Sequence, residues 1–274
     1  MRAFDTTGNV IWIDLKQCRV ICWRVTEWIS DNLTGYMADF SGSDLTCLRG
    51  ERLVFGGLSF TAKSGDAVML RGRNGAGKSS LLRLMAGLLS PRSGNLCWNG
   101  ENIADDRNAH QTRTQYLGHQ DAIKPVLSVR DNLRLWGQLR GVRDLDAAID
   151  HALDALDIHH LSRVNGRYLS SGQKRRTALA RVLIGPSDLW LLDEPTVGLD
   201  RESCAELTQL IAAFRARGGI VIYSTHTDLD IESPSILDLD EFAIPMIEWL
   251  AEHSELEDGR ADTQARSASK EAAQ

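Results

Sequence analysis

The residues with the clearest chemical meaning form a glycine-rich segment, 72–79, which reads GRNGAGKS. It fits the G-x-x-x-x-G-K-[ST] pattern, in which glycines let backbone N–H groups approach phosphate oxygens and a following helix directs its positive end at the same anion. Lys78 should reach the β- and γ-phosphates, and the Ser79 hydroxyl should bind Mg²⁺. A structural glycine turn is the alternative, but an expected strand before the segment and a helix after it argue against that. The expected nucleotide-binding residues are Gly72, Arg73, Asn74, Gly75, Ala76, Gly77, Lys78, Ser79 and Ser80.

A second chemical feature is the acidic pair Asp193-Glu194, which follows the apolar run Leu-Trp-Leu-Leu at 189–192. A buried strand here would deliver a carboxylate to the nucleotide edge of a sheet. Asp193 suits the Mg²⁺ shell, and Glu194 suits a general base that orients the attacking water. Without the phosphate loop, the pair would be read as a strand-ending turn before Pro195. With it, the pair predicts hydrolysis of a nucleoside triphosphate.

These residues need an α/β framework to position them. Short strands are expected at 58–62, 67–70, 96–98, 114–118, 188–192 and 220–224, with helices at 78–88 and 200–217. Between them, residues 121–185 read as an all-helical insertion. Its first helix carries Val129, Leu133, Trp136 and Leu139 on one side, after a capping-box spacing at Ser128 and Asp131. Its second carries Ile149, Ala152, Leu153 and Leu156, and its third spans 172–183.

Composition excludes several protein classes. The 274 residues carry a net charge of −6, which argues against a broad nucleic-acid surface. No apolar run approaches the roughly 20 residues that span a bilayer, so a transported substrate would cross through another polypeptide. Five scattered cysteines do not suggest a disulfide framework and favour a reducing compartment.

The two ends of the chain differ from its middle. Residues 1–36 are expected to be a start-site artefact or a poorly ordered extension, and an amphipathic membrane contact is the alternative. The polar segment 252–274 is expected to be a disordered tail.

A third motif, LSSGQ at 169–173, identifies a family when it is combined with the two others. In this order, GRNGAGKS, LSSGQ and LLDEP resemble the ATP-binding subunit of an ABC transporter over residues 45–240. The resemblance implies a P-loop NTPase core with an inserted helical subdomain at about 121–185, and ATP with Mg²⁺ as ligands. Ser171 replaces the first glycine of the usual LSGGQ. In the family this turn acts on a second copy's nucleotide, which implies that Ser170, Gly172 and Gln173 complete a site in trans.

The resemblance assigns further residues. Gln120 stands where the family places a glutamine that senses Mg²⁺ and the attacking water, and His226 stands where it places a switch histidine at the γ-phosphate. Taken alone, His226 would be read as a strand-end histidine. Asp200 matches a loop that crosses the dimer interface. Arg49 occupies the position at which the family has an aromatic residue that stacks on adenine. A guanidinium can also stack on a base, or Phe55 can contribute to base binding instead.

A narrower resemblance comes from residues 116–133, which contain GHQ followed by Ile123 and Lys124. They are similar to the haem-exporter ATPases of cytochrome c maturation. That family implies a peripheral subunit on the cytoplasmic face of the inner membrane, a second copy of itself and separate membrane subunits. Ile123, Lys124 and Pro125 are the expected membrane-subunit contact, with an ordinary exposed loop as the alternative. No haem site is expected on this chain, and His119 is expected to pack. The ATPase of another permease, or a soluble ABC ATPase with an assembly role, remain alternative readings.

Overall fold

The computed structural model describes residues 2–4, 10–12, 38–50, 52–227 and 229–243. These fall into two compact units. The core unit contains Ala38–Gln120, Ser187–Val197 and residues 208–243. The helical unit contains Asp121–Pro186 and Gly198–Leu207, together with β1 (Arg2–Phe4) and β2 (Val10–Trp12), which pair antiparallel. Most of the expected extension 1–36, and all of the expected tail 252–274, lie outside the described residues.

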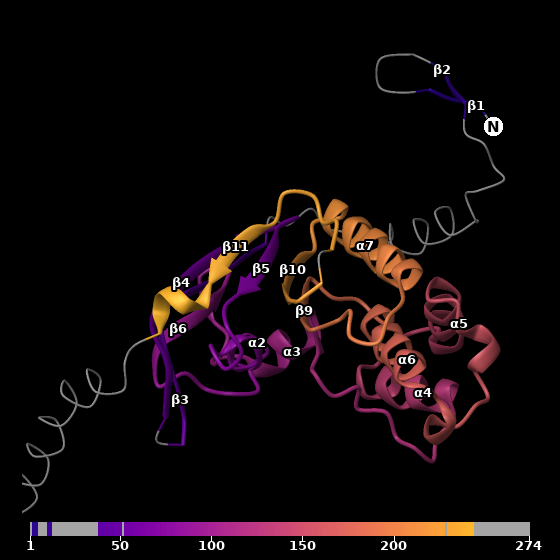
Figure 1. Cartoon of the computed structure of the whole chain (residues 1–274), viewed down its shortest axis with the longest axis horizontal. Helices are drawn as coiled ribbons and strands as arrows, with labels where there is room; N and C mark the ends of the chain where they lie inside the picture. Colours follow the sequence, from indigo (N-terminus) through magenta and orange to yellow (C-terminus); the bar gives the residue numbers. More distant parts are fainter. Residues whose placement is uncertain (1, 5–9, 13–37, 51, 228, 244–274) are drawn as a thin grey trace, which may run out of the picture. The chain divides into compact units, whose positions relative to one another are not determined.

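The core unit is built around a five-stranded sheet in which all neighbouring strands are parallel (Figure 1). Its order is β11 (Ser235–Asp238), β5 (Ala67–Arg71), β10 (Ile220–Ser224), β9 (Leu189–Asp193) and β8 (Thr114–Leu117). Every residue of β9 and β10 is buried, as expected for inner strands of a parallel sheet. Parallel strands end at one edge, so the segments that follow β5, β8, β9 and β10 emerge there together.

A second sheet of the core unit is antiparallel, in the order β4 (Arg52–Lys63), β3 (Asp39–Arg49), β6 (Ser93–Trp98) and β7 (Glu101–Asn102). Strand β3 was not among the expected strands, and it begins before Leu45, the expected start of the domain. Its register against β4 shifts between Gly42 and Leu45, which interrupts the alternation of inward and outward side chains.

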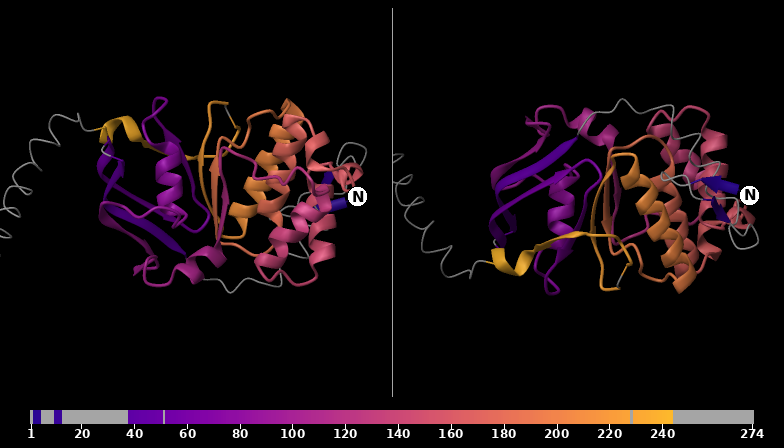
Figure 2. Two further views of the ribbon diagram at one scale, coloured as in Figure 1. Left: turned by 90° about the horizontal axis from the view of Figure 1, so that it is seen from below. Right: turned by 90° about the horizontal axis from the view of Figure 1, so that it is seen from above.

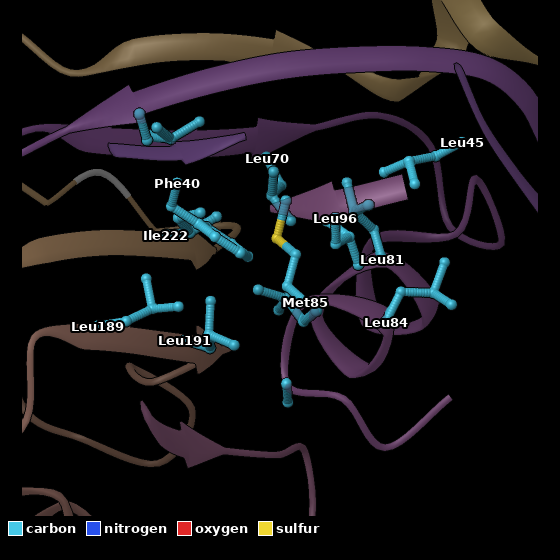
Figure 3. Close-up of a cluster of buried hydrophobic side chains, with 14 of the residues drawn as sticks. Phe40, Leu45, Leu70, Leu81, Leu84, Met85, Leu96, Leu189, Leu191 and Ile222 are labelled. Carbon is cyan, nitrogen blue, oxygen red and sulfur yellow. The ribbon is translucent and has the colours of Figure 1, made fainter. Parts of the chain in front are cut away.

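Helix α2 (Lys78–Met85) joins both sheets into one hydrophobic core. Figure 3 shows Leu81, Leu84 and Met85 of the helix beside Leu70, Leu96, Leu191 and Ile222 of the strands. The helix is shorter than the expected 78–88, because Gly87 adopts a left-handed φ of 68° two residues after its end. Helix α3 (Arg107–Arg113) and the 3₁₀ turn η3 (Leu239–Phe242) complete this unit. Helix α7 (Arg201–Ala216) stacks Phe214 on Trp190 of β9, with ring centroids 4.0 Å apart.

The helical unit contains α4 (Val129–Leu139), α5 (Leu145–Ala155) and α6 (Ser171–Leu183), each in contact with the other two. Figure 2 shows this group in two views. The 3₁₀ turns η1 (His159–Leu161) and η2 (Gly166–Tyr168) lie between α5 and α6. All four apolar residues expected on α5 are buried, but Leu139 of α4 is 71% exposed. Among the described residues, no helix combines the length and hydropathy that a membrane span requires.

Candidate nucleotide site

A cavity of about 600 Å³ lies in the core unit, at the edge where the parallel strands end. Its lining comes from the loop after β5, the ends of β9 and β10, the segment after β8 and the β3–β4 hairpin. The lining residues are Arg49, Arg52, Val54, Asn74, Gly75, Gly77, Lys78, Ser79, Ser80, His119, Asp193, Glu194, Val197 and His226. Segments far apart in the sequence therefore surround one space.

The phosphate loop has the backbone that its glycines allow. Gly75 and Gly77 have φ values of 89° and 107°, in the region that favours glycine. Gly77 is the N-cap of α2 and supplies no side-chain cap, so the first N–H groups of the helix remain available to an anion. The Lys78 ammonium donates to the carbonyls of Gly72 and Arg73, at 2.6 and 3.3 Å. This folds the side chain back over the loop, where a phosphate would sit.

Three members of the expected binding set do not line the cavity: Gly72, Arg73 and Ala76. The Arg73 guanidinium lies 3.4 Å from the Asp240 carboxylate, and its backbone N–H donates to the same group at 3.2 Å. Arg73 therefore links the loop to η3, and its side chain does not contribute to the cavity wall.

The end of β9 holds both predicted carboxylates. Asp193 is 1% exposed, and its Oδ1 accepts a 2.9 Å hydrogen bond from the Ser224 hydroxyl. Glu194 has φ 51°, a left-handed conformation that is uncommon for a residue with a side chain. Its backbone N–H donates to the Ser224 carbonyl at 3.0 Å, which holds this turn against β10. Ser224 was missed because its only signal is its position at the end of a buried strand.

His226 lies beside Glu194. The His226 backbone N–H donates to Glu194 Oε2 at 3.2 Å, and the Nε2 atom lies 3.4 Å from Oε1. The side chain of Glu194 is 12% exposed, whereas that of His226 is 63% exposed. The imidazole is therefore accessible to a ligand while its neighbour is largely covered.

Two expectations about neighbouring residues change. Gln120 is exposed but does not line the cavity, whereas His119, which was expected to pack, is exposed and does line it. Arg49 lines the cavity as expected, together with Arg52, which was not anticipated. Phe55 is fully buried in the hydrophobic core, so the suggestion that it assists base binding is wrong.

The signature residues Ser170, Gly172 and Gln173 belong to the helical unit and start α6. Ser170 and Gln173 form a capping box, with the Ser170 N–H donating to Gln173 Oε1 at 2.9 Å and the Gln173 N–H donating to Ser170 Oγ at 3.3 Å. A Cβ on Gly172 would lie 2.5 Å from the Gly198 carbonyl oxygen, so only glycine allows this approach. None of the three lines the cavity, whose lining residues all belong to the core unit.

The oxygen donors in the cavity suit Mg²⁺, which prefers oxygen ligands and keeps several waters or phosphate oxygens. Ser79 and Asp193 both line it, and Gln120 is the third residue expected to bind the ion. Within the described part of the chain, no group of three or more His, Cys, Asp or Glu side chains could hold a metal by protein ligands alone. The residues present therefore fit an ion that is held jointly with a nucleotide.

Comparison with known proteins agrees with this geometry. A family model described as ABC transporter matches residues 55–197. The cytochrome c biogenesis ATP-binding export protein CcmA of Paramagnetospirillum magneticum is 52% identical over 207 residues, covering 75% of this chain and 95% of that protein. The protein of the same name from Rhodospirillum rubrum is 51% identical over 206 residues, which cover 75% of this chain and 88% of that protein.

The fold agrees as well. The solved structure of an ABC transporter ATP-binding protein from Pyrococcus furiosus superposes with a TM-score of 0.66 at 26% identity, over 75% of this chain and all of that one. The predicted α/β fold class, a P-loop NTPase of the ABC type, is confirmed. The chain thus belongs to the ATP-binding proteins of the ABC transporter family, and within it to the cytochrome c biogenesis ATP-binding export proteins.

Proposed function

We propose that this chain hydrolyses ATP to power haem export, or release of a haem-loaded chaperone, during c-type cytochrome biogenesis. The observation that carries the enzymatic part is the cavity in which Lys78, Asp193, Glu194 and His226 meet. The names of the relatives supply the biological role. The haem itself is assigned to partner subunits and not to this chain.

The chemistry follows from the position of each group. ATP places its phosphates on the loop 72–79, where Lys78 and the N-terminal end of α2 neutralise their charge. Ser79 and Asp193, with Gln120, would hold a Mg²⁺ ion, which would supply positive charge against the charge that develops on the phosphates. Glu194 accepts the proton of the attacking water, and His226 beside it contacts the γ-phosphate. Arg49 stacks on the base.

A second copy of the chain is part of the proposal. Ser170, Gly172 and Gln173 would contact the γ-phosphate held by the partner, so two copies close around two ATP molecules. Hydrolysis removes the phosphate that bridges both chains and releases the closed form.

The proposed contact with the membrane subunits lies on the helical unit. The side chain of Asn132, which is 1% exposed, accepts from the Lys124 N–H at 2.7 Å and donates to the Lys124 carbonyl at 3.1 Å. This anchors the loop that contains Pro125 and Val126. The Arg167 N–H donates to the Pro125 carbonyl at 3.0 Å, which brings the segment 166–168 alongside.

Val126 and Tyr168 are 73% and 70% exposed on these two segments, and Lys124 and Pro125 are also exposed. Ile123 is half-buried, and its Cγ2 would lie 2.8 Å from a Cβ on Gly166. We therefore assign the contact to Lys124, Pro125, Val126 and Tyr168, and give Ile123 a supporting position. A peripheral location on the cytoplasmic face of the inner membrane follows from this proposal.

Affinity capture after co-expression with the membrane subunits of cytochrome c maturation tests the role. The tagged chain should retain those subunits, and Val126→Glu should lose them while keeping basal ATPase activity. Leu139→Glu is the matched control, because Leu139 is equally exposed on the same unit. Capture of a different permease would show that the chain is the ATPase of that permease and not of the cytochrome c maturation complex. Failure to capture any membrane subunit, with ATPase activity intact, would remove transport from the proposal.

A further inference from the structure

Two arginines and a valine form the side of the cavity that comes from the β3–β4 hairpin. Arg49 ends β3 and Arg52 begins β4, and their Cα atoms are register partners. With Val54 they line the cavity, and we call these three residues the hairpin wall. Within the described part of the chain, neither guanidinium makes a hydrogen bond or an ion pair. The wall therefore offers two cationic donor groups that are not engaged by any described residue.

Buried and cavity-lining side chains alternate along the start of β4, next to the phosphate loop. Leu53 and Phe55 are buried, whereas Arg52 and Val54 alternate with them along the strand and line the cavity, and Val54 also packs against the edge of the core. Val54 Cγ1 and Phe55 Cδ1 lie 2.6 and 2.9 Å from the point where a Cβ on Gly77 would stand, so this part of β4 lies beside the phosphate loop. A nucleotide with its phosphates on the loop therefore has the hairpin wall within reach of its base.

Directly opposed residues of antiparallel strands have Cβ atoms about 5 Å apart. One guanidinium can thus lie over a purine ring while the other reaches the ring's edge. Guanidinium groups carry only donors. The edge of guanine presents two acceptors, O6 and N7, which match a bidentate arginine, whereas adenine presents N7 beside the N6 amino group, itself a donor. An aromatic platform would bind either base, because every base has a π-face.

We propose that Arg52 reads the O6/N7 edge of a purine while Arg49 lies over its ring. The chain therefore binds guanosine and inosine triphosphates at least as tightly as ATP. This inference rests on the proposed function, because it takes the cavity to be the nucleotide site.

Equilibrium dissociation constants of the purified full chain for ATP, GTP and inosine triphosphate test the idea. Inosine triphosphate keeps O6 and N7 but lacks the 2-amino group, so it should bind like GTP. Arg52→Ala should weaken GTP and inosine triphosphate about tenfold, within the range for one lost bidentate contact, and ATP by less than about threefold. Arg49→Ala should weaken all three by similar factors. Arg92→Ala, an exposed arginine of the core unit that does not line the cavity, is the control.

Three results would overturn the inference and leave the ATPase proposal standing. The first is ATP binding that is measurably tighter than GTP binding. The second is an equal effect of Arg52→Ala on all three nucleotides. The third is inosine triphosphate binding like ATP while GTP binds more tightly, which would assign selectivity to the 2-amino group. Loss of binding for every nucleotide in the unmodified chain would instead overturn the proposed function, and this inference with it.

Discussion

The two adjacent carboxylates at the end of β9 lie in different surroundings. Asp193 is buried and hydrogen-bonded to Ser224, whereas Glu194 turns away through its left-handed backbone and lies beside His226. A left-handed conformation in a residue with a side chain costs about 1–3 kcal/mol and persists where the surroundings hold it in place. Here the hydrogen bond to the Ser224 carbonyl does so. The left-handed turn thus gives the two neighbouring acids different surroundings, as the separate roles proposed for them require.

Replacing Glu194 by Gln tests the task of the second acid. The variant should bind ATP normally, lose hydrolysis by at least about 100-fold because the base is gone, and accumulate an ATP-bound dimer. Phosphate release and size-exclusion chromatography with ATP are the measurements. Glu202→Gln, an exposed acid of α7, should behave as the unmodified chain does. Normal turnover by Glu194→Gln would remove that residue from the base role.

Ser224→Ala tests the support of the first acid. Ser224 is fully buried, and the change removes a hydrogen bond to a buried carboxylate, which we expect to lower the free energy of unfolding by about 1–3 kcal/mol. It should also raise the Mg²⁺ concentration needed for half-maximal ATPase activity, because Asp193 is less well oriented. Urea unfolding and Mg²⁺ titration measure the two effects, with the exposed Ser93→Ala as control. An unchanged Mg²⁺ requirement would show that Ser224 has only a structural role.

At the scale of elements, two serines begin helices of the helical unit in the same way. Ser128 Oγ accepts from the Asp131 N–H at 3.1 Å at the start of α4, and Ser170 Oγ accepts from the Gln173 N–H at 3.3 Å at the start of α6. Only Ser170 belongs to the signature turn. Comparing the two serines therefore distinguishes the role of a helix cap from a role in nucleotide hydrolysis.

Replacing either serine by alanine should lower the free energy of unfolding by about 1 kcal/mol, the usual loss for such a cap. Ser170→Ala should in addition reduce the ATPase rate, whereas Ser128→Ala should leave it unchanged. Chemical denaturation and steady-state ATPase assays measure both. Equal ATPase rates for the two variants would restrict Ser170 to its capping role.

Sequence patterns predicted the elements that end on the nucleotide. The loop 72–79, the strand before Asp193 and the strand before His226 carry strong local signals, and all three border the cavity. Strand β3 was missed because its shift in register breaks the alternation, and α3 because its seven residues are mostly polar. Ser224 and Arg52 could not be found in this way, because their positions depend on partners distant in the sequence. The roles of the signature residues stay a prediction.

At the scale of the whole molecule, pH should alter stability through one buried histidine. His110 of α3 is 2% exposed, stacks on Phe40 and has its Nε2 atom 2.7 Å from the Met85 carbonyl. Burial lowers the pKa of His110 below its ordinary value of 6.5, with the Met85 carbonyl opposing this and Arg113 adding to it. The unfolded chain therefore binds the proton more readily, and stability must fall with acid.

The contribution of His110 should be fully present above about pH 6.5 and lost as the pH falls toward its folded pKa. Urea unfolding between pH 7.5 and 5.5 should show a decline that is smaller in His110→Gln. The exposed His160→Gln is the control and should keep the decline of the unmodified chain. If the free energy of unfolding falls equally with pH in all three proteins, the pH effect comes from groups other than His110.

The proposed dimer predicts complementation between two inactive chains. Lys78→Ala should weaken nucleotide binding itself, and Gly172→Val should disable the signature turn, because a side chain there meets the Gly198 carbonyl. In a mixed dimer, the intact phosphate loop of the Gly172→Val chain would lie opposite the intact signature turn of the Lys78→Ala chain, which gives one complete site. The mixture should therefore hydrolyse ATP faster than either variant alone. Activity no greater than that of the separate variants would contradict sites shared between chains.

The order of the parallel sheet also governs when the site can first exist during synthesis. Strand β10 lies between β5 and β9, yet it is the last of the three to leave the ribosome. A nascent chain that stops before Ile220 carries both the phosphate loop and Asp193, but lacks the strand that joins them into one sheet. The sheet that joins the phosphate loop to Asp193 can therefore form only after β10 has been synthesised, long after the phosphate loop itself.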